Sequence, residues 1–220
     1  MLMILVGESQ LSHGEILNCA FSNDDYNILG SLYQCEVTTL DNTHNNLIIT
    51  GHTGTHMAKE NNNNVKAIYI HDTNTKYVPK NLGLLFNLTA LAMWNGKLVE
   101  IKSTDFHGMQ DLIYISFRAN QLTSVPSDVF DTLTKLRTIS LDVNQIEELP
   151  IDLFSKNLNV EEIFIRNNKI KFIATGFLNG LTQLNKVELI DNICVSKNYE
   201  GTTAIIQLKE DIQMKCWNPN

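Results

Sequence analysis

The second half of the chain repeats itself every 24 residues, and this period constrains the fold more than any other feature. An asparagine returns at Asn120, Asn144, Asn168 and Asn192. The segments that align on it begin at Leu88, Leu112, Leu136, Val160 and Leu184, and a degenerate 23-residue unit begins at Val65. Self-similarity at such a period is typical of a solenoid, in which each unit packs only against its neighbours.

The residue types within a unit indicate which side chains form the core. Positions one, four and six are apolar, as in Leu112, Ile115 and Phe117, and short strands stacked in one parallel sheet would bury them together. The chain must then turn inside the coil, where backbone groups lack water. An amide side chain both donates and accepts hydrogen bonds, so we interpret the asparagine ladder as structural and not catalytic.

The pattern L-x-x-L-x-L-x-x-N-x-L over residues 65–193 resembles that of extracellular leucine-rich repeat proteins of the 24-residue type. Phe106, Phe130 and Phe154 match the phenylalanine spine of that subtype, and Phe177 and Leu178 together align with its last position. The resemblance, to short secreted arthropod members and Toll-type ectodomains, implies an α/β-type solenoid. A short parallel sheet would form the concave face, and loops and turns the convex face. Gly96 replaces the asparagine of its unit, so we expect that unit to be looser.

The resemblance also implies terminal caps that are tied by disulfides, because a solenoid ends in open strand edges. We expect an N-terminal β-hairpin cap over 15–64, about six repeats over 65–193 and a C-terminal cap over 194–220. Short strands are predicted at 15–22, 31–40 and 46–51. Residues 1–14 are apolar at first but lack basic residues, so they are predicted to be a signal-peptide remnant or a disordered terminus.

We expect the four cysteines to lie outside the strand array, two at each end, and we predict the bridges Cys19–Cys35 and Cys194–Cys216. A bridge over a loop of this length stabilises a fold by about 3 kcal/mol in the chain-entropy model. The alternatives are reduced thiols or a zinc site, although the close spacing of zinc ligands is absent. Disulfides would place the protein in an oxidising compartment.

Other motifs give weaker signals. His52 and His56 are four residues apart with Glu60 beyond, so metal binding is one possible interpretation. The surrounding glycines and threonines favour the alternative, solvent-exposed histidines in a turn. We therefore expect no metal. The four asparagines at 61–64 read as a polar turn. Asn87 begins the sequence Asn-Leu-Thr and is a possible glycosylation site. No nucleophile elbow or phosphate loop is present in the sequence, so we expect no enzyme and no cofactor.

The strand positions between the inward ones should face the concave side. The third positions are Ala67, Ala90, Tyr114, Thr138, Glu162 and Lys186; the fifth are Tyr69, Ala92, Ser116, Ser140, Phe164 and Glu188; the seventh are His71, Trp94, Arg118, Asp142, Arg166 and Ile190.

Aromatic and arginine side chains are typical of protein interfaces, which makes this face the candidate binding site. The predicted ligand-binding residues are Tyr69, His71, Trp94, Tyr114, Arg118, Asp142, Phe164 and Arg166. The alternative is that Asp142 only neutralises the two arginines and that the aromatic rings only cover neighbouring strands.

We therefore expect a secreted, extracellular repeat protein that binds a protein, or a glycan, through this face. The resemblance implies innate immunity or cell adhesion as the setting, and an intracellular scaffold or enzyme inhibitor is the alternative. A formal net charge of −7 argues against nucleic acid as the main partner. The sequence contains no membrane span, and it leaves the oligomeric state open.

Overall fold

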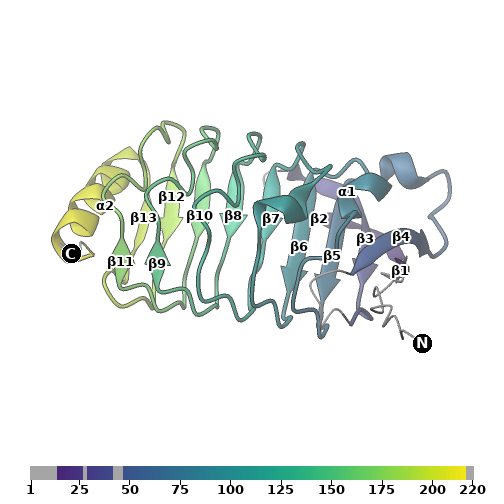
Figure 1. The fold of residues 1–220 in the computed structure, drawn as a ribbon. Coiled ribbons are helices and arrows are strands. Elements are labelled where there is room, and N and C mark those ends of the chain that lie inside the picture. The colour runs from purple at the N-terminus through teal and green to yellow at the C-terminus, as the bar shows by residue number, and fades with distance from the viewer. Residues whose placement is uncertain (1–13, 27–28, 42–46, 217–220) are drawn as a thin grey trace, which may run out of the picture.

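The computed structural model describes residues 14–26, 29–41 and 47–216, and it has the predicted solenoid architecture (Figure 1). Of the expected terminal segment 1–14, only Gly14 lies within the described residues. A nine-stranded sheet runs along the described part in the order β13-β12-β10-β8-β7-β6-β5-β3-β2. Its strands are β2 (Ala20–Asp25), β3 (Ser31–Val37), β5 (Ala67–His71), β6 (Ala90–Trp94), β7 (Tyr114–Ser116), β8 (Thr138–Ser140), β10 (Glu162–Phe164), β12 (Lys186–Glu188) and β13 (Asn198–Glu200).

The remaining elements are short except for one helix at the C-terminal end. Two pairs of parallel strands lie outside the long sheet: β1 (Gly14–Asn18) with β4 (Ile48–Thr53), and β9 (Glu148–Leu149) with β11 (Phe172–Ile173). The helical segments are η2 (Asn62–Asn64), α1 (Leu82–Leu85), η3 (Ser103–Phe106) and α2 (Thr202–Lys215). The β9–β11 pair forms part of the back wall of the coil, across the core from the long sheet (Figure 1).

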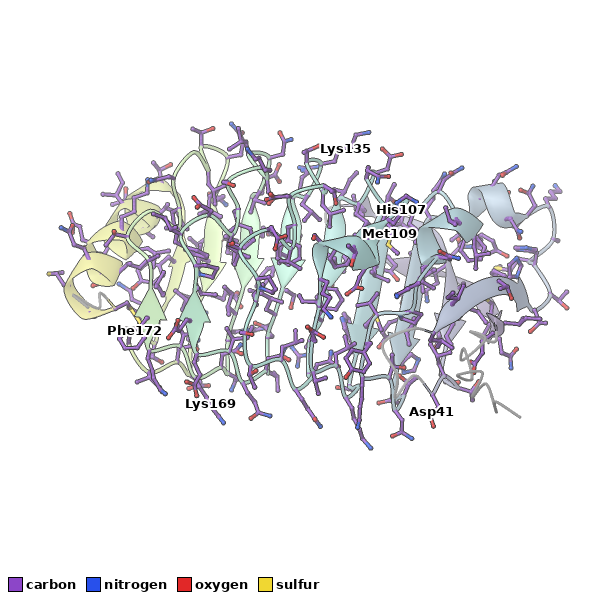
Figure 2. All side chains as sticks on the ribbon, viewed as in Figure 1. Asp41, His107, Met109, Lys135, Lys169 and Phe172 are labelled. Carbon is purple, nitrogen blue, oxygen red and sulfur yellow. A yellow bond between two sulfur atoms is a disulfide. The ribbon has the colours of Figure 1, made fainter. Side chains whose placement is uncertain are left out.

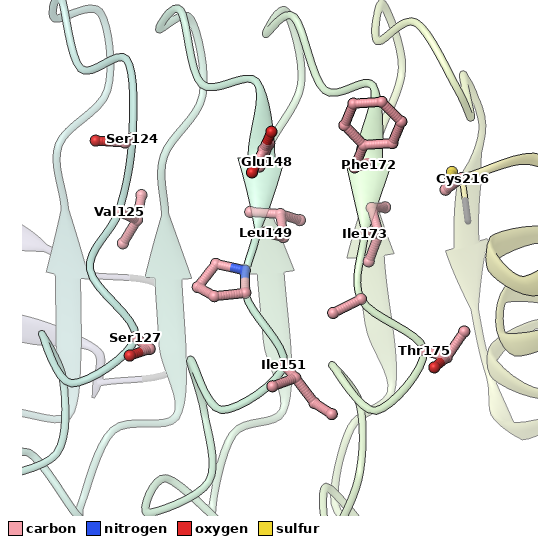
Figure 3. A pocket seen from close by; sticks show the side chains of 12 residues that line it. Ser124, Val125, Ser127, Glu148, Leu149, Ile151, Phe172, Ile173, Thr175 and Cys216 are labelled. Atoms are coloured by element: carbon pink, nitrogen blue, oxygen red, sulfur yellow. The ribbon is translucent and has the colours of Figure 1, made fainter. Parts of the chain in front are cut away.

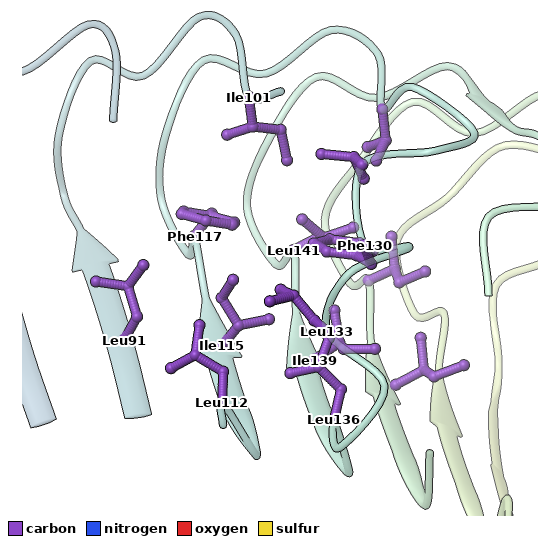
Figure 4. Close-up of a cluster of buried hydrophobic side chains, with 14 of the residues drawn as sticks. Leu91, Ile101, Leu112, Ile115, Phe117, Phe130, Leu133, Leu136, Ile139 and Leu141 are labelled. Carbon is purple, nitrogen blue, oxygen red and sulfur yellow. The ribbon is translucent and has the colours of Figure 1, made fainter. Parts of the chain in front are cut away.

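The central strands pair in the register that the 24-residue period predicts. Ile115 pairs with Leu91 on one side and with Ile139 on the other, and the same register continues through β10 and β12. These inward side chains are fully buried and pack into one continuous core (Figure 4). The phenylalanine spine is stacked through it, with the ring centroids of Phe130 and Phe154 6.0 Å apart. The sheet is therefore built by the apolar positions of the repeat.

The asparagine side chains bridge successive turns of the coil. The Asn144 side-chain nitrogen donates to the carbonyl oxygens of Phe117, Leu141 and Asp142, at 2.9, 3.1 and 3.2 Å. Its oxygen accepts the backbone N–H of Leu122 at 3.0 Å. Asn120, Asn168 and Asn192 make the equivalent contacts in their own units. Each asparagine thus satisfies buried backbone groups in its own unit and in the unit before it.

The residue before each of these positions adopts a left-handed backbone conformation, which the sequence did not suggest. The φ angles are 56° at Ala119, 56° at Val143, 53° at Asn167 and 59° at Asp191. Asparagine and aspartate tolerate this region, whereas a β-branched residue such as Val143 is strained in it. In the unit where Gly96 replaces the asparagine, a Cβ at Gly96 would lie 2.9 Å from the Oδ1 of Asn120. The looseness expected for that unit stays a prediction.

The N-terminal cap contains the predicted hairpin, but it is continuous with the repeat sheet. β2 and β3 pair antiparallel, and β3 then pairs parallel with β5 as if it were one more repeat strand. Cys35 lies within β3, pairs in register with Ile68, and is bridged to Cys19. The expectation that the cysteines lie outside the strand array is wrong for Cys35, because the hairpin extends the sheet instead of only covering its edge.

The C-terminal cap consists of β13 and α2. β13 pairs antiparallel with β12, and α2 buries Ile205, Leu208 and Ile212 against the end of the core. The hydroxyl of Tyr199 donates to Asp211 at 2.6 Å, which fixes the helix to the last strand. The second predicted disulfide, Cys194–Cys216, joins the last repeat to the end of the helix. Both ends of the apolar core are therefore covered, and both covers are covalently tied.

Candidate functional site

An open groove of about 440 Å³ crosses the outer surface of the nine-stranded sheet, which we call the concave face. Strands β6, β7, β8 and β10 contribute to it, together with the residues that follow them. Its lining residues are Trp94, Tyr114, Ser116, Arg118, Thr138, Ser140, Asp142, Phe164 and Arg166. Six of the eight residues predicted for ligand binding are therefore brought together in one depression, because successive repeats place the same positions side by side.

Small side chains form the floor of the groove, and large ones form its walls. Ser116, Thr138 and Ser140 are buried and lie between the larger side chains of neighbouring positions. The indole N–H of Trp94 donates to the hydroxyl of Ser116 at 2.7 Å, which fixes the orientation of the ring. The aromatic side chains of Trp94, Tyr114 and Phe164 remain partly exposed, so they are available for contact with another molecule.

The three charged residues of the groove are not equivalent. Asp142 is almost fully buried, and it accepts hydrogen bonds from the backbone N–H of Arg166 at 2.7 Å and from its guanidinium at 2.7 and 3.2 Å. The hydrogen bond to Asp142 raises the pKa of Arg166 above its ordinary value. Arg118 lies 3.8 Å from the same carboxylate and has 47% of its side chain exposed. Asp142 therefore anchors Arg166, and Arg118 is the arginine more available to a partner.

The remaining predicted residues, Tyr69 and His71, lie next to the groove at its N-terminal side. The Tyr69 ring stacks on His71 at 4.3 Å between centroids and contacts Trp94 edge-on at 4.9 Å. The imidazole of His71 lies between Glu36, at 2.7 Å, and Asp72, at 2.8 Å. Burial lowers the pKa of His71, but hydrogen bonds to Asp72 and Glu36 outweigh this effect and raise it above its usual value.

One contributor to this face, Tyr26, was missed from the sequence, and a second, Lys186, was not among the predicted ligand-binding residues. Tyr26, in the chain that follows β2, lies over Ala67 and Ala90 and contacts Tyr114 edge-on at 5.5 Å. Lys186 lies 5.3 Å from the centre of the Phe164 ring at the other end of the groove. The third-position column of the repeat had already placed Lys186 on this face. No repeat signal precedes Tyr26, because the hairpin that carries it stands outside the 24-residue period.

The two histidines with metal-ligand spacing are packed in an aromatic cluster instead. His56 stacks on Phe21 at 4.1 Å, and its two ring nitrogens contact the Tyr33 hydroxyl at 3.0 Å and Asn62 at 2.7 Å. His52 lies in β4 against Phe21. The expectation of solvent-exposed turn histidines is wrong for His52, which lies in β4, and both side chains are only partly exposed because they pack against Phe21. The described residues hold no group of three His, Cys, Asp or Glu side chains arranged for a metal ion.

A second, larger hollow of about 520 Å³ lies on the back wall beside β9 and β11 (Figure 3). Its walls are mostly short or apolar side chains, such as Ser124, Leu149 and Ile173, and Glu148 is the charged residue among them. It lacks the combination of aromatic rings and guanidinium groups that the concave groove presents. We therefore take the concave groove as the candidate site.

Two further observations concern glycosylation and membrane spans. Asn87 is exposed in the loop between α1 and β6, where a glycan would have space. Within the ranges that the structure covers, no helix has the length and apolar character to cross a membrane.

Comparison with known proteins finds the leucine rich repeat family model at residues 86–146 and 134–192. A search of curated proteins finds no match. Among solved structures, a repeat chain in an octameric complex of Latrophilin 3, Unc5D and FLRT2 superposes with a TM-score of 0.54 at 20% identity, covering 71% of this chain and 46% of that one. A chain of the Drosophila Toll–Spatzle complex gives a TM-score of 0.45 at 19% identity, covering 59% and 24%. The present chain thus spans less than half the length of either match.

Proposed function

Because the chain belongs to the leucine-rich repeat proteins, we propose that it binds a protein partner through the groove on its concave face. The observation that carries the proposal is the convergence of three aromatic rings and two guanidinium groups in one groove. Such side chains contribute most of the binding energy in protein interfaces, because they bury large areas and form several hydrogen bonds. This composition supports a role in binding.

The ion pairs within the groove favour a binding role for its residues over a purely structural role. Asp142 neutralises Arg166, as the structural alternative requires. Its ion pair with Arg118 is longer, at 3.8 Å, and leaves 47% of the Arg118 side chain exposed. An acidic or carbonyl-rich surface of a partner could therefore pair with Arg118 while apolar side chains pack on Trp94 and Phe164.

We further propose that the protein acts outside the cell. One disulfide lies within the N-terminal cap and the other joins the last repeat to the C-terminal helix, and such bonds persist in oxidising compartments. The exposed Asn87 sequon is in line with export. Innate immunity and cell adhesion are the settings that we propose, and the identity of the captured partner decides between them. The FLRT2 structure, in which a chain of this fold belongs to a complex of several proteins, also supports partner binding.

The test is affinity capture from the extracellular fluid of the source organism with three baits. The wild-type chain is compared with Arg118→Glu, which reverses a charge in the groove, and with Lys169→Glu, which makes the same change at an exposed edge of the solenoid (Figure 2). We expect one protein to be retained by wild type and by Lys169→Glu but lost from Arg118→Glu. Equal retention by all three folded baits would refute binding through the groove.

The compartment has a separate test. Thiol labelling of the native protein, purified without reductant, should detect no free cysteine, because all four are paired. Labelling of four cysteines in native material would favour the intracellular alternative.

A further inference from the structure

Beside the groove, the concave face contains a smaller hollow whose walls are aromatic and whose rim is acidic. Its volume is about 120 Å³, and it is lined by Asp24, Asp25, Tyr26, Tyr69, Ala92, Trp94 and Tyr114. We call the four ring-bearing residues among these, Tyr26, Tyr69, Trp94 and Tyr114, the aromatic box. Tyr69, Trp94 and Tyr114 come from three strands of the repeat sheet, and Tyr26 comes from the chain that follows β2 in the N-terminal hairpin.

Small residues in the strands create this hollow. Ala67, Ala90 and Ala92 leave the sheet surface low at this end, and all three are buried. The Tyr26 ring fills the space above the first two, and the space above Ala92 remains open. The rings meet mainly edge to face, at 5.5 Å between Tyr26 and Tyr114. The box is therefore preformed by packing and does not need to assemble around a ligand.

Two of the four ring side chains of the box already have a hydrogen-bond partner for their polar atom. The Tyr26 hydroxyl donates to Gln34 at 2.5 Å, and the Trp94 indole N–H donates to Ser116 at 2.7 Å. Asp24 and Asp25 are exposed, and neither forms an ion pair with any residue that the structure describes. The site thus combines aromatic ring surface with two carboxylates that have no ion-pair partner among the described residues.

We propose that the aromatic box binds the methylated ammonium head of a small organic cation of the choline type. Ring faces attract cations, and several rings around one site strengthen the attraction once water is excluded. A methylated head has no N–H donors to leave unsatisfied between rings, whereas a primary ammonium would lose hydrogen bonds to water. The hollow is smaller than the roughly 300–1,000 Å³ of drug-sized ligand sites, so it suits a head group and not a large ligand.

This site is independent of the proposed protein partner, although Trp94 and Tyr114 belong both to the box and to the groove. The experiment can therefore use the chain alone. Choline and its uncharged isostere 3,3-dimethylbutan-1-ol, which differ in charge but hardly in shape, are titrated into the disulfide-intact protein and followed by ligand-observed NMR. We expect choline to bind about tenfold more tightly, since the attraction of rings for a cation is of that order. Equal binding, or no binding of choline, would overturn the proposal.

Variants then locate the site. Trp94→Leu removes one ring while keeping an apolar side chain and should weaken choline binding at least about fivefold. Phe164→Leu, the matched control in the groove outside the box, should leave it unchanged. Asp24→Asn together with Asp25→Asn should weaken binding and reduce its dependence on salt.

Tetramethylammonium should bind more tightly than n-butylammonium. Unchanged affinity in Trp94→Leu, or tighter binding of n-butylammonium, would refute the assignment.

Discussion

Replacing Asn144 by alanine tests the claim that the asparagine ladder holds the coil together, and the structure indicates how much the change should cost. Of the four backbone groups that Asn144 contacts, three are carbonyl oxygens with a second partner. The Phe117 oxygen also accepts from Asn120, the Leu141 oxygen from Asn168, and the Asp142 oxygen from a backbone N–H. The Leu122 N–H, by contrast, has Asn144 as its partner among the described residues.

The expected cost is therefore dominated by one orphaned donor. A buried N–H without a partner costs about 1–3 kcal/mol, and weakening the three shared carbonyl contacts adds about 1 kcal/mol. We predict that Asn144→Ala lowers the free energy of unfolding by about 2–4 kcal/mol. In a domain of this size, this loss corresponds to a fall of about 4–16 °C in the melting temperature.

Urea and thermal unfolding followed by circular dichroism, with the disulfides intact, would measure this effect. Two variants serve as comparisons. Asn192→Ala should cost less, because Asn192 is only partly buried and water can replace it at the last repeat. Asn144→Asp keeps the shape but cannot donate, so it should be at least as destabilising as alanine at neutral pH. An Asn144→Ala protein within about 0.5 kcal/mol of wild type would refute the structural role of the ladder.

Three further predictions concern the backbone, the surface and the pH response. Val143→Asn should stabilise the fold by about 1 kcal/mol, because asparagine adopts the left-handed turn more easily, as Asn167 does; an unchanged or lower melting temperature would contradict this. Asn87→Gln should remove one N-linked glycan from protein secreted by a glycosylating host, and an unaltered mass would exclude that site. The pKa of His71 is raised in the folded protein, so protonated His71 stabilises the fold. This stabilisation is fully present below about pH 6.5, the ordinary pKa of histidine, and is lost as the pH rises through the pKa of the folded state. The free energies of unfolding of wild type and His71→Gln, measured in urea across this range, should become equal at high pH. A difference that does not change with pH would contradict this prediction.

The architecture was predictable because one periodic pattern determines most of it. Each inward position of the repeat recurs after 24 residues, so the strand register, the core and the asparagine contacts follow from a single alignment. The Cys194–Cys216 bridge was predictable from its place after the last repeat. The two central charges, Arg118 and Asp142, were placed next to each other for the same reason, since neighbouring units present equal positions side by side.

What was missed lies outside the period or depends on tertiary packing. No pattern indicated that the hairpin before the first repeat would extend the sheet through β3, or that Tyr26 would lie over the concave face. The histidines seemed exposed because the residues around them are polar, whereas Phe21, about 30 residues earlier in the chain, packs against both rings. The left-handed turn at Val143 was also unforeseen, because valine is a poor residue for it.

The most direct test of the concave face as the binding surface is hydroxyl-radical footprinting of the chain with and without its captured partner. Two partly exposed phenylalanines give an internal comparison. Phe164 lines the groove. Phe172, labelled in Figure 2, lies on the back wall. We predict that the partner lowers the oxidation of Phe164, along with Trp94 and Tyr114, and leaves Phe172 as reactive as before. Protection of Phe172 with no change at Phe164 would contradict it and would move the interface to the back wall.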